Sequence, residues 1–241
     1  MKRLSFFLLL ALFSLAACKE TFIETDPGVV GYGYYPLEVG DYRVYSVTDI
    51  KFLDNEGDTS RFQLKEEVAE SFVDQTNTLV YKIIRSVRPD AQASWVEDSV
   101  MVVAKFSTSV ILTKDNVKSV KLVFPVKNGK AWSADAYNNR TVNSENDGKE
   151  KYTYASVGEP FTVNGSTYNQ TLTVVQGKPA SNFIMLSDRK EVYAQDIGMI
   201  YRLFNKAAYC NQIGSSDCPY GEGYILNGHK REEVLLSYGK M

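Results

Sequence analysis

The sequence has few of the residues that build metal and catalytic sites. Its 241 residues include one histidine and three cysteines, and 27 basic side chains nearly balance 29 acidic ones. One imidazole and three scattered thiols cannot supply a zinc cluster, and a balanced charge leaves no basic footprint for nucleic acid. The 44% of apolar residues is enough for a buried core. We therefore expect a globular protein without a metal, a cofactor or a nucleic-acid partner.

Long hydrophobic runs are scarce as well, and the clearest one lies at the start. Residues 4–15 follow a basic Met1-Lys2-Arg3 segment and are rich in Leu and Phe, but the run is about 8 residues too short to span a bilayer. It ends in Leu-Ala-Ala-Cys18, which is typical of a bacterial lipobox. The order predicts a cleaved signal peptide at 1–17 and acyl chains on Cys18 that anchor the protein in the outer membrane. The alternative is an ordinary secretory signal with Cys18 there by coincidence.

The two remaining cysteines, Cys210 and Cys218, are separated by seven residues. In an exported protein such a pair is most simply a disulfide, and the spacing differs from the C-x-x-C of redox and metal pairs. Tyr209, Tyr220 and Tyr224 flank it. A closed loop with exposed tyrosines is a candidate binding surface for an envelope protein or a glycan. The alternative is that these tyrosines are ordinary strand residues that cover a sheet edge.

The rest of the chain predicts β-structure. Residues 18–34 contain Pro and Gly without a sustained period, so we expect an acylated Cys with a tether, followed by one β domain at 35–241. Apolar side chains alternate with period two, and in the strand expected near 95–106 one apolar face should carry Val96, Val100, Val102, Ala104 and Phe106. The best helical candidate, residues 64–72, also fits a bulged strand. Turn signals lie at 54–58, 74–78, 128–129, 147–148, 164–165 and 227–228, of which Asn164-Gly165 is the clearest hairpin. The fold class is all-β, as an antiparallel sandwich or an open, curled half-barrel with hairpin connections.

An internal echo links two segments of the chain. Residues 35–42 (YPLEVGDY) and 124–132 (FPVKNGKAW) share an aromatic residue, Pro, an aliphatic residue and Gly, followed by another aromatic residue. Pro ends a strand ladder and Gly permits a tight bend, so the echo predicts two sub-sheets that each begin at the same corner. A chance recurrence of Pro-x-x-x-Gly corners is the alternative.

Together with residues 191–201 (EVYAQDIGMIY), these corners carry a resemblance to a known group. The chain resembles Bacteroidetes-type lipoproteins of unassigned function, which have two Pro-Leu-x-x-Gly-x-x-Trp corners and a Tyr-Ala-x-x-Val-Gly-x-Val segment. Arg43 stands where the first corner of that pattern has Trp. The resemblance implies an all-β envelope protein and transfers no catalytic residue.

Catalytic arrangements find little support. His229 follows Asn227-Gly228, so we expect it in an exposed turn, poorly placed for a nucleophilic triad. The adjacent acids Glu66-Glu67 and Glu232-Glu233 point to opposite faces of a strand, unlike a glycosidase pair. We expect a lipid-anchored, non-catalytic binding or accessory module of the envelope. The alternatives are a lipid or hydrophobe carrier with an open half-barrel, and an envelope hydrolase.

Overall fold

The fold is one large antiparallel sheet, as the all-β prediction requires. The structure is a computed structural model and describes residues 27–138, 150–212, 218 and 223–241. Its strands follow the order β6-β5-β4-β3-β2-β1-β13-β12-β11-β9-β8-β7, and β10 pairs with β11. The elements are α2 (Pro27–Val30), η1 (Tyr32–Tyr34), β1 (Asp41–Leu53), β2 (Glu56–Val73), β3 (Leu79–Arg88), β4 (Val96–Lys105), β5 (Ser109–Lys114), β6 (Val117–Val123), β7 (Ala131–Ser133), β8 (Lys151–Val163), β9 (Ser166–Gln176), β10 (Ala180–Ser181), β11 (Met185–Ala194), β12 (Gly198–Tyr209) and β13 (Ile225–Lys240).

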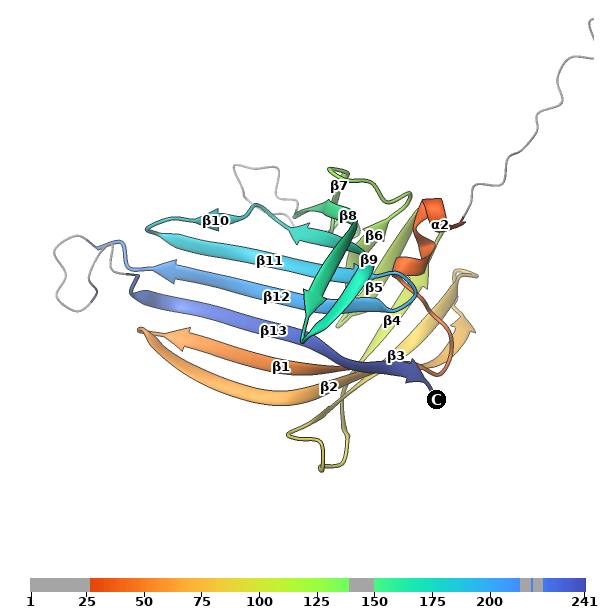
Figure 1. Cartoon of the computed structure of the whole chain (residues 1–241), viewed down its shortest axis with the longest axis horizontal. Coiled ribbons are helices and arrows are strands. Elements are labelled where there is room, and N and C mark those ends of the chain that lie inside the picture. Colours follow the sequence, from red (N-terminus) through yellow and green to blue (C-terminus); the bar gives the residue numbers. More distant parts are fainter. Residues whose placement is uncertain (1–26, 139–149, 213–217, 219–222) are drawn as a thin grey trace, which may run out of the picture.

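The sheet curls until its two edges meet (Figure 1). The first strand, β1, pairs with the last, β13, and both therefore lie in the middle of the sheet. The edge strands β6 and β7 meet at a seam, where the Val120 amide donates to the Ala134 carbonyl over 2.8 Å. The Trp132 indole N–H donates to the Val120 carbonyl over 2.9 Å. The half-barrel alternative is therefore confirmed, and the sandwich is not what forms.

The two echoed corners occupy equivalent places in this curl. Gly40 and Gly129 have φ angles of 93° and 77°, in the region that glycine tolerates best. The first corner leads into β1 and the second into β7. From there β1 to β6 form one run of sequential neighbours, and β7 to β13, with β10 set aside, form another. Two sub-sheets that each begin at a corner are what the tandem interpretation expects.

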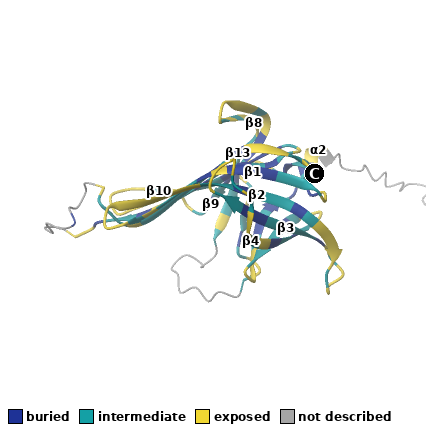
Figure 2. Ribbon diagram, turned by 90° about the horizontal axis from the view of Figure 1, so that it is seen from below, coloured by how far each residue is buried: buried dark blue, intermediate teal, exposed yellow. Residues whose placement is uncertain are grey.

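Hydrophobic side chains from all parts of the sheet fill much of the curl. Two clusters contain Tyr45, Tyr154, Tyr193 and other buried residues. Buried positions concentrate in the curled part, whereas the far ends of the strands are exposed (Figure 2). Val30 and Tyr34, at 7% and 5% exposure, belong to the first cluster. The packed region therefore begins before the predicted boundary at residue 35, because these two side chains of the expected tether lie in the core.

Several local predictions hold. Asn164 and Gly165 join β8 to β9 with φ angles of 50° and 75°, which is the hairpin expected from Asn-Gly. Residues 64–72 lie within β2, where the pairing with β3 shifts between Val68 and Glu70. The bulged-strand interpretation of that segment is therefore confirmed.

Two local predictions are wrong. In β4 the buried residues are Met101 and Val103, while Val100 is 46% exposed. Valine suits either face of a strand, so its alternation did not identify the inner face. The expected turn at Asn227-Gly228 lies inside β13, where Gly228 pairs with both neighbouring strands. A Cβ at Gly228 would lie 3.1 Å from the Lys206 carbonyl oxygen, so this glycine serves close backbone approach instead. The predicted turn at 147–148 lies outside the described residues.

Candidate functional site

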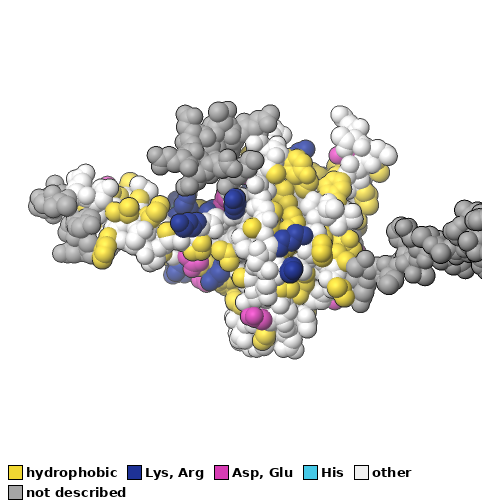
Figure 3. Space-filling model, turned by 90° about the horizontal axis from the view of Figure 1, so that it is seen from above, with side chains coloured by type: hydrophobic (Ala, Val, Ile, Leu, Met, Phe, Trp, Pro, Cys, Tyr) yellow, Lys and Arg dark blue, Asp and Glu magenta, His cyan; other side chains and the backbone are white. Residues whose placement is uncertain are grey.

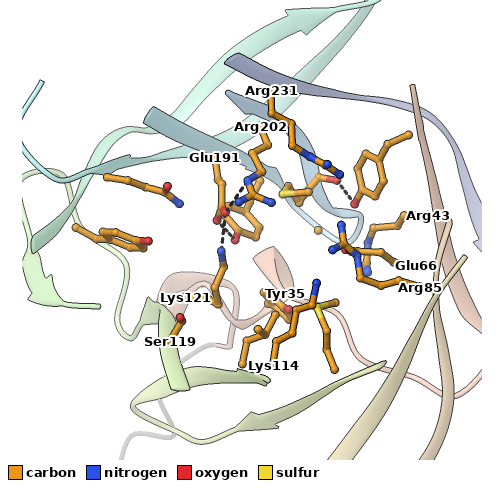
Figure 4. A pocket seen from close by; sticks show the side chains of 18 of the residues that line it. Tyr35, Arg43, Glu66, Arg85, Lys114, Ser119, Lys121, Glu191, Arg202 and Arg231 are labelled. Atoms are coloured by element: carbon orange, nitrogen blue, oxygen red, sulfur yellow. Dashed lines mark hydrogen bonds and ion pairs between the residues drawn. The ribbon is translucent and has the colours of Figure 1, made fainter. Parts of the chain in front are cut away.

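A pocket of about 490 Å³ lies inside the curl and receives side chains from both sub-sheets (Figure 4). Its volume is in the range of small-molecule sites. Six basic and three acidic side chains line it, which gives its wall a cationic excess. The basic residues are Arg43, Arg85, Lys114, Lys121, Arg202 and Arg231, and the acidic ones are Glu66, Asp115 and Glu191.

A row of alternating charges crosses three adjacent strands of the second sub-sheet. Glu191 of β11 pairs in register with Arg202 of β12, which pairs with Glu233 of β13. The two carboxylates are almost wholly buried, at 1% and 0% exposure. Arg202 lies 3.7 Å from Glu191 and 3.6 Å from Glu233, so one guanidinium serves both carboxylates.

Glu191 also reaches across the pocket to the opposite sub-sheet. Its Oε1 accepts a hydrogen bond from Lys121 Nζ over 2.6 Å, and its Oε2 accepts one from the Tyr193 hydroxyl over 2.6 Å. Burial alone would raise the pKa of Glu191, but the charges of Lys121 and Arg202 and these hydrogen bonds outweigh it and lower the pKa to about 2. Glu191 is therefore a permanent anion at neutral pH and ties β11 to β6.

A β-bulge aims Lys121 at this carboxylate. In the pairing of β5 with β6, Val110 lies opposite Leu122 and Ile111 opposite Val120, so Lys121 is left without a partner residue. Such bulges re-aim a side chain at the cost of one ladder position. The inward direction of Lys121 is thus fixed by the local backbone.

Glu233 is the second fully buried carboxylate. Its Oε1 accepts a hydrogen bond from Arg231 Nε over 2.7 Å, and Arg85 Nη2 lies 3.9 Å away. Burial raises the pKa of Glu233, but Arg202, Arg231 and Arg85 reverse the effect and lower it. Glu233 therefore stays ionised and joins β13 to β12 and β3.

A second row of charges crosses the first sub-sheet. Its order is basic, acidic, basic, whereas the first row is acidic, basic, acidic. Glu66 of β2 lies in register between Arg43 of β1 and Arg85 of β3. Glu66 lies 3.2 Å from Arg85 Nε. Arg43 is only 6% exposed and is held by two carbonyls: its Nε donates to Ile197 O over 2.5 Å and its Nη2 to Pro36 O over 3.1 Å. Within the described residues it forms no ion pair with a carboxylate, although Glu66 is its in-register neighbour.

Lys114 carries a second charge without a counterion. It ends β5 and lines the pocket beside the exposed turn residue Asp115. Its amine makes no hydrogen bond or ion pair with any part of the chain that the structure describes. In Figure 4 the labelled Lys114, Lys121, Arg202 and Arg43 surround the same opening from different strands.

The remaining wall is aromatic and apolar. Tyr35, Tyr45, Met101, Leu112 and Met199 are among its residues. On one outer face of the molecule, Lys and Arg side chains likewise lie among hydrophobic ones (Figure 3). The pocket can therefore contact both a charged group and an apolar body.

The residues singled out by sequence lie elsewhere. His229 lies within β13, with Nε2 2.5 Å from Asp49 Oδ1, so the predicted turn is wrong, although the side chain is 39% exposed. Its strand position follows from the continuous pairing of β13 with β1 and β12, which the Asn-Gly signal concealed. His229 does not line the pocket.

The predicted cysteine pair forms a disulfide in the structure. The Cα atoms of Cys210 and Cys218 lie 5.7 Å apart. Tyr209 and Tyr224 are half-buried, and neither lines the pocket. Tyr220 and Cys18 lie outside the described residues, as does the signal segment at 1–17. The candidate surface around the disulfide thus stays a prediction, separate from the pocket.

Sequence reasoning missed the pocket residues, although a signal for them existed. On β1, Arg43 alternates with the buried Tyr45 and Val47, and on β13 Glu233 alternates with the buried Leu235. A charged residue in an apolar inner row is buried, and several such residues on neighbouring strands indicate an interior ion network. The adjacent acids Glu66-Glu67 and Glu232-Glu233 do predict one inward carboxylate each, and the structure has Glu66 in the pocket wall and Glu233 buried, but the alternation does not identify their basic partners.

Fold and site together define a curled, single-sheet β protein with a charged interior pocket. No protein-family model matches the chain, and no curated protein matches it. Two solved structures are similar to it: a protein of Bacteroides fragilis assigned as exported and given a YmcC-like fold, and a protein of Parabacteroides distasonis assigned as a lipoprotein. Each is 10% identical and covers 86% of this chain and 98% of its own, with TM-scores of 0.39 and 0.38.

Two features are absent from the described residues. No helix among them is long and apolar enough to cross a membrane. Within the same ranges, no group of three or more His, Cys, Asp or Glu residues is arranged to hold a metal ion.

Proposed function

We propose that the protein is a lipid-anchored envelope lipoprotein that binds a small ligand inside its half-barrel and performs no chemistry on it. The observation that carries the binding role is the pocket of about 490 Å³ within the curl. The lipobox that ends at Cys18 supports the anchor and the outer-membrane location.

The electrostatics support a binding role over a catalytic one. A general acid or base at neutral pH needs a pKa near 7. Glu191 and Glu233, the most buried carboxylates, have lowered pKa values because basic side chains surround them. The single histidine lies outside the pocket wall. The hydrolase alternative therefore gains no support from the groups that face the pocket.

A lipid or hydrophobe carrier would also need a cavity, but the lining it requires differs from the one observed. A carrier of neutral lipid needs an apolar concave surface, because burying unpaired charges against hydrocarbon is costly. Here six basic side chains face the space. The lining thus favours a ligand with a polar or charged part over a purely hydrophobic one.

The anchor is tested by Cys18→Ala in the native host. Without the thiol that accepts the lipid, we expect the protein to leave the outer-membrane fraction or to keep its signal peptide. Immunoblots of membrane and soluble fractions measure this, with Cys210→Ala/Cys218→Ala as a cysteine control that should remain in the membrane. Unchanged fractionation of the Cys18 variant would contradict the anchor.

The pocket is tested with the lipid-free mature chain, which carries Cys18→Ala. We expect 8-anilinonaphthalene-1-sulfonate to bind at one saturable site, measured by its fluorescence. Ser119 lines the pocket, so the bulky side chain of Ser119→Trp should remove this binding. Ser237→Trp, at an exposed position of β13, should leave it unchanged. If the probe does not bind at a saturable site, or if both variants bind it equally, the pocket is not the binding site.

A further inference from the structure

The pocket holds more positive charge than its own acids neutralise. Three acidic side chains face six basic ones, and two carboxylates outside the lining, Glu233 and Asp49, pair with Arg231. The ion pairs of Glu191, Glu233 and Glu66 involve Lys121, Arg202, Arg231 and Arg85. Arg43 and Lys114 are left over.

The Arg43 guanidinium is buried and fixed in one orientation in the pocket wall. Burying a guanidinium without a counterion is costly, and a bound anion removes that cost. The two carbonyl contacts of Nε and Nη2 fix the side chain, and Nη1 makes no hydrogen bond among the described residues. Gly198 permits this position, because a Cβ there would lie 2.7 Å from Arg43 Nε. The guanidinium is therefore oriented before any ligand arrives.

Lys114 completes the cationic part of the pocket from another strand of the same sub-sheet. It stands on β5, whereas Arg43 stands on β1, and both face the same space (Figure 4). A planar guanidinium and a mobile ammonium are the usual partners of carboxylate and phosphate groups. Met101, Leu112 and Met199 line the same pocket and offer apolar contact.

We propose that the pocket binds a small organic oxyanion, with its carboxylate or phosphate group between Arg43 and Lys114 and its apolar body against Met101, Leu112 and Met199. This inference rests on the proposed ligand-binding function and specifies the ligand class. Charge decides between ligands of equal shape, because a neutral analogue leaves both cations without a counterion.

Two probes of similar shape separate charge from hydrophobicity. The first is 8-anilinonaphthalene-1-sulfonate, which is an anion, and the second is N-phenyl-1-naphthylamine, which is uncharged. In the lipid-free mature chain we expect Lys114→Met to weaken binding of the anion by about ten-fold, the usual worth of one charge-assisted hydrogen bond. Binding of the neutral probe should not weaken. Lys118→Met is the control, because Lys118 lies on the same hairpin, is exposed and does not line the pocket.

Two further experiments test how the anion is recognised and which class of anion binds. Arg43→Lys keeps the charge but loses the planar fork, so it should also weaken binding of the sulfonate; circular dichroism checks that both variants fold. Competition with benzoate, phenyl phosphate and inorganic phosphate then identifies the chemistry. We expect the two organic anions to displace the probe and inorganic phosphate to fail.

The outcomes separate this inference from the proposed function. If Lys114→Met and Arg43→Lys bind the anion as the parent chain does, or if inorganic phosphate alone displaces the probe, the organic-oxyanion inference is overturned while a saturable pocket remains. If neither probe finds a site that Ser119→Trp closes, the proposed binding function fails first.

Discussion

Glu191 shows how one buried side chain can hold distant strands together. It accepts hydrogen bonds from Lys121 on β6 and Tyr193 on β11, and it lies within ion-pair distance of Arg202 on β12. A buried carboxylate with this many donors stabilises the fold mainly because its removal leaves its cationic partners uncompensated.

Replacing Glu191 with Gln should therefore be costly. We expect Glu191→Gln to lower the free energy of unfolding by about 3 kcal/mol, because Lys121 and Arg202 lose their shared anion inside the curl. The control is Glu70→Gln, which removes a 3.0 Å ion pair with Lys82 where the glutamate side chain is 56% exposed, and should cost less than about 1 kcal/mol. Urea denaturation measures both. Equal losses would show that the interior network contributes no more than a surface pair.

The same carboxylate should make stability depend on acid. Its pKa is lowered in the folded state to about 2, from an ordinary value of 4.5. The stabilisation is therefore complete above pH 4.5 and is lost as the pH falls toward 2, since the unfolded state takes up the proton first. Thermal melts between pH 6 and 2 should show a shallower decline for Glu191→Gln than for the parent chain. Parallel declines would contradict the lowered pKa.

The turn between β11 and β12 contacts the start of β1 through Gly198 and Arg43. Gly198 has a φ of 93° and lies directly beneath the Arg43 guanidinium. In the resembled pattern, Arg43 occupies the Trp position of the first corner and Gly198 is the Gly of the later segment. The two sequence motifs therefore meet in space, and the glycine leaves room for the large side chain that crosses it.

The stability loss of Gly198→Ala, compared with that of Gly158→Ala, distinguishes the cost of this contact from the cost of backbone strain. A Cβ at Gly198 meets Arg43 at 2.7 Å, whereas a Cβ at Gly158, with a similar φ of 82°, meets nothing within 4 Å. Gly158→Ala should cost about 1 kcal/mol for its left-handed backbone alone, and Gly198→Ala about 2 to 3 kcal/mol. Adding Arg43→Ala should recover part of the second loss. Chemical denaturation of the four proteins measures the difference, and equal losses for the two glycines would show that the contact carries no strain.

Hairpins were the most predictable elements. Asn164-Gly165 needs two positive φ angles, which local chemistry alone determines. The Asp115-Asn116 turn, with φ angles of 50° and 60°, lacks glycine and was not predicted. The pocket could not be located from one strand at a time, because Arg43, Glu66 and Arg85 become neighbours only through pairing across β1, β2 and β3. Their inner position was readable, but their partners depend on register.

The seam between β6 and β7 decides whether the sheet acts as a closed wall around the pocket. At this seam, hydrogen bonds from side chains to the backbone take the place of a continuous ladder between strands. The Tyr154 hydroxyl, on β8, donates to the Val123 carbonyl over 2.9 Å and accepts from the Val123 amide over 2.8 Å. Trp132 adds the 2.9 Å bond to Val120. Lys121, which holds Glu191 from β6, depends on this edge strand staying in place.

Tyr154→Phe should open the seam. The substitution removes one buried hydroxyl but leaves the donor and the acceptor of Val123 unsatisfied, so we expect a loss of about 1 to 3 kcal/mol. Hydrogen exchange should accelerate most at the amides of β6, because that edge strand loses its tie to β8. Tyr152→Phe is the matched control on the same strand, since its hydroxyl makes no hydrogen bond within the described ranges. It should change neither stability nor exchange at β6. Acceleration spread evenly over the sheet would show instead that Tyr154 stabilises the core as a whole and that β6 is held in place by its pairing with β5.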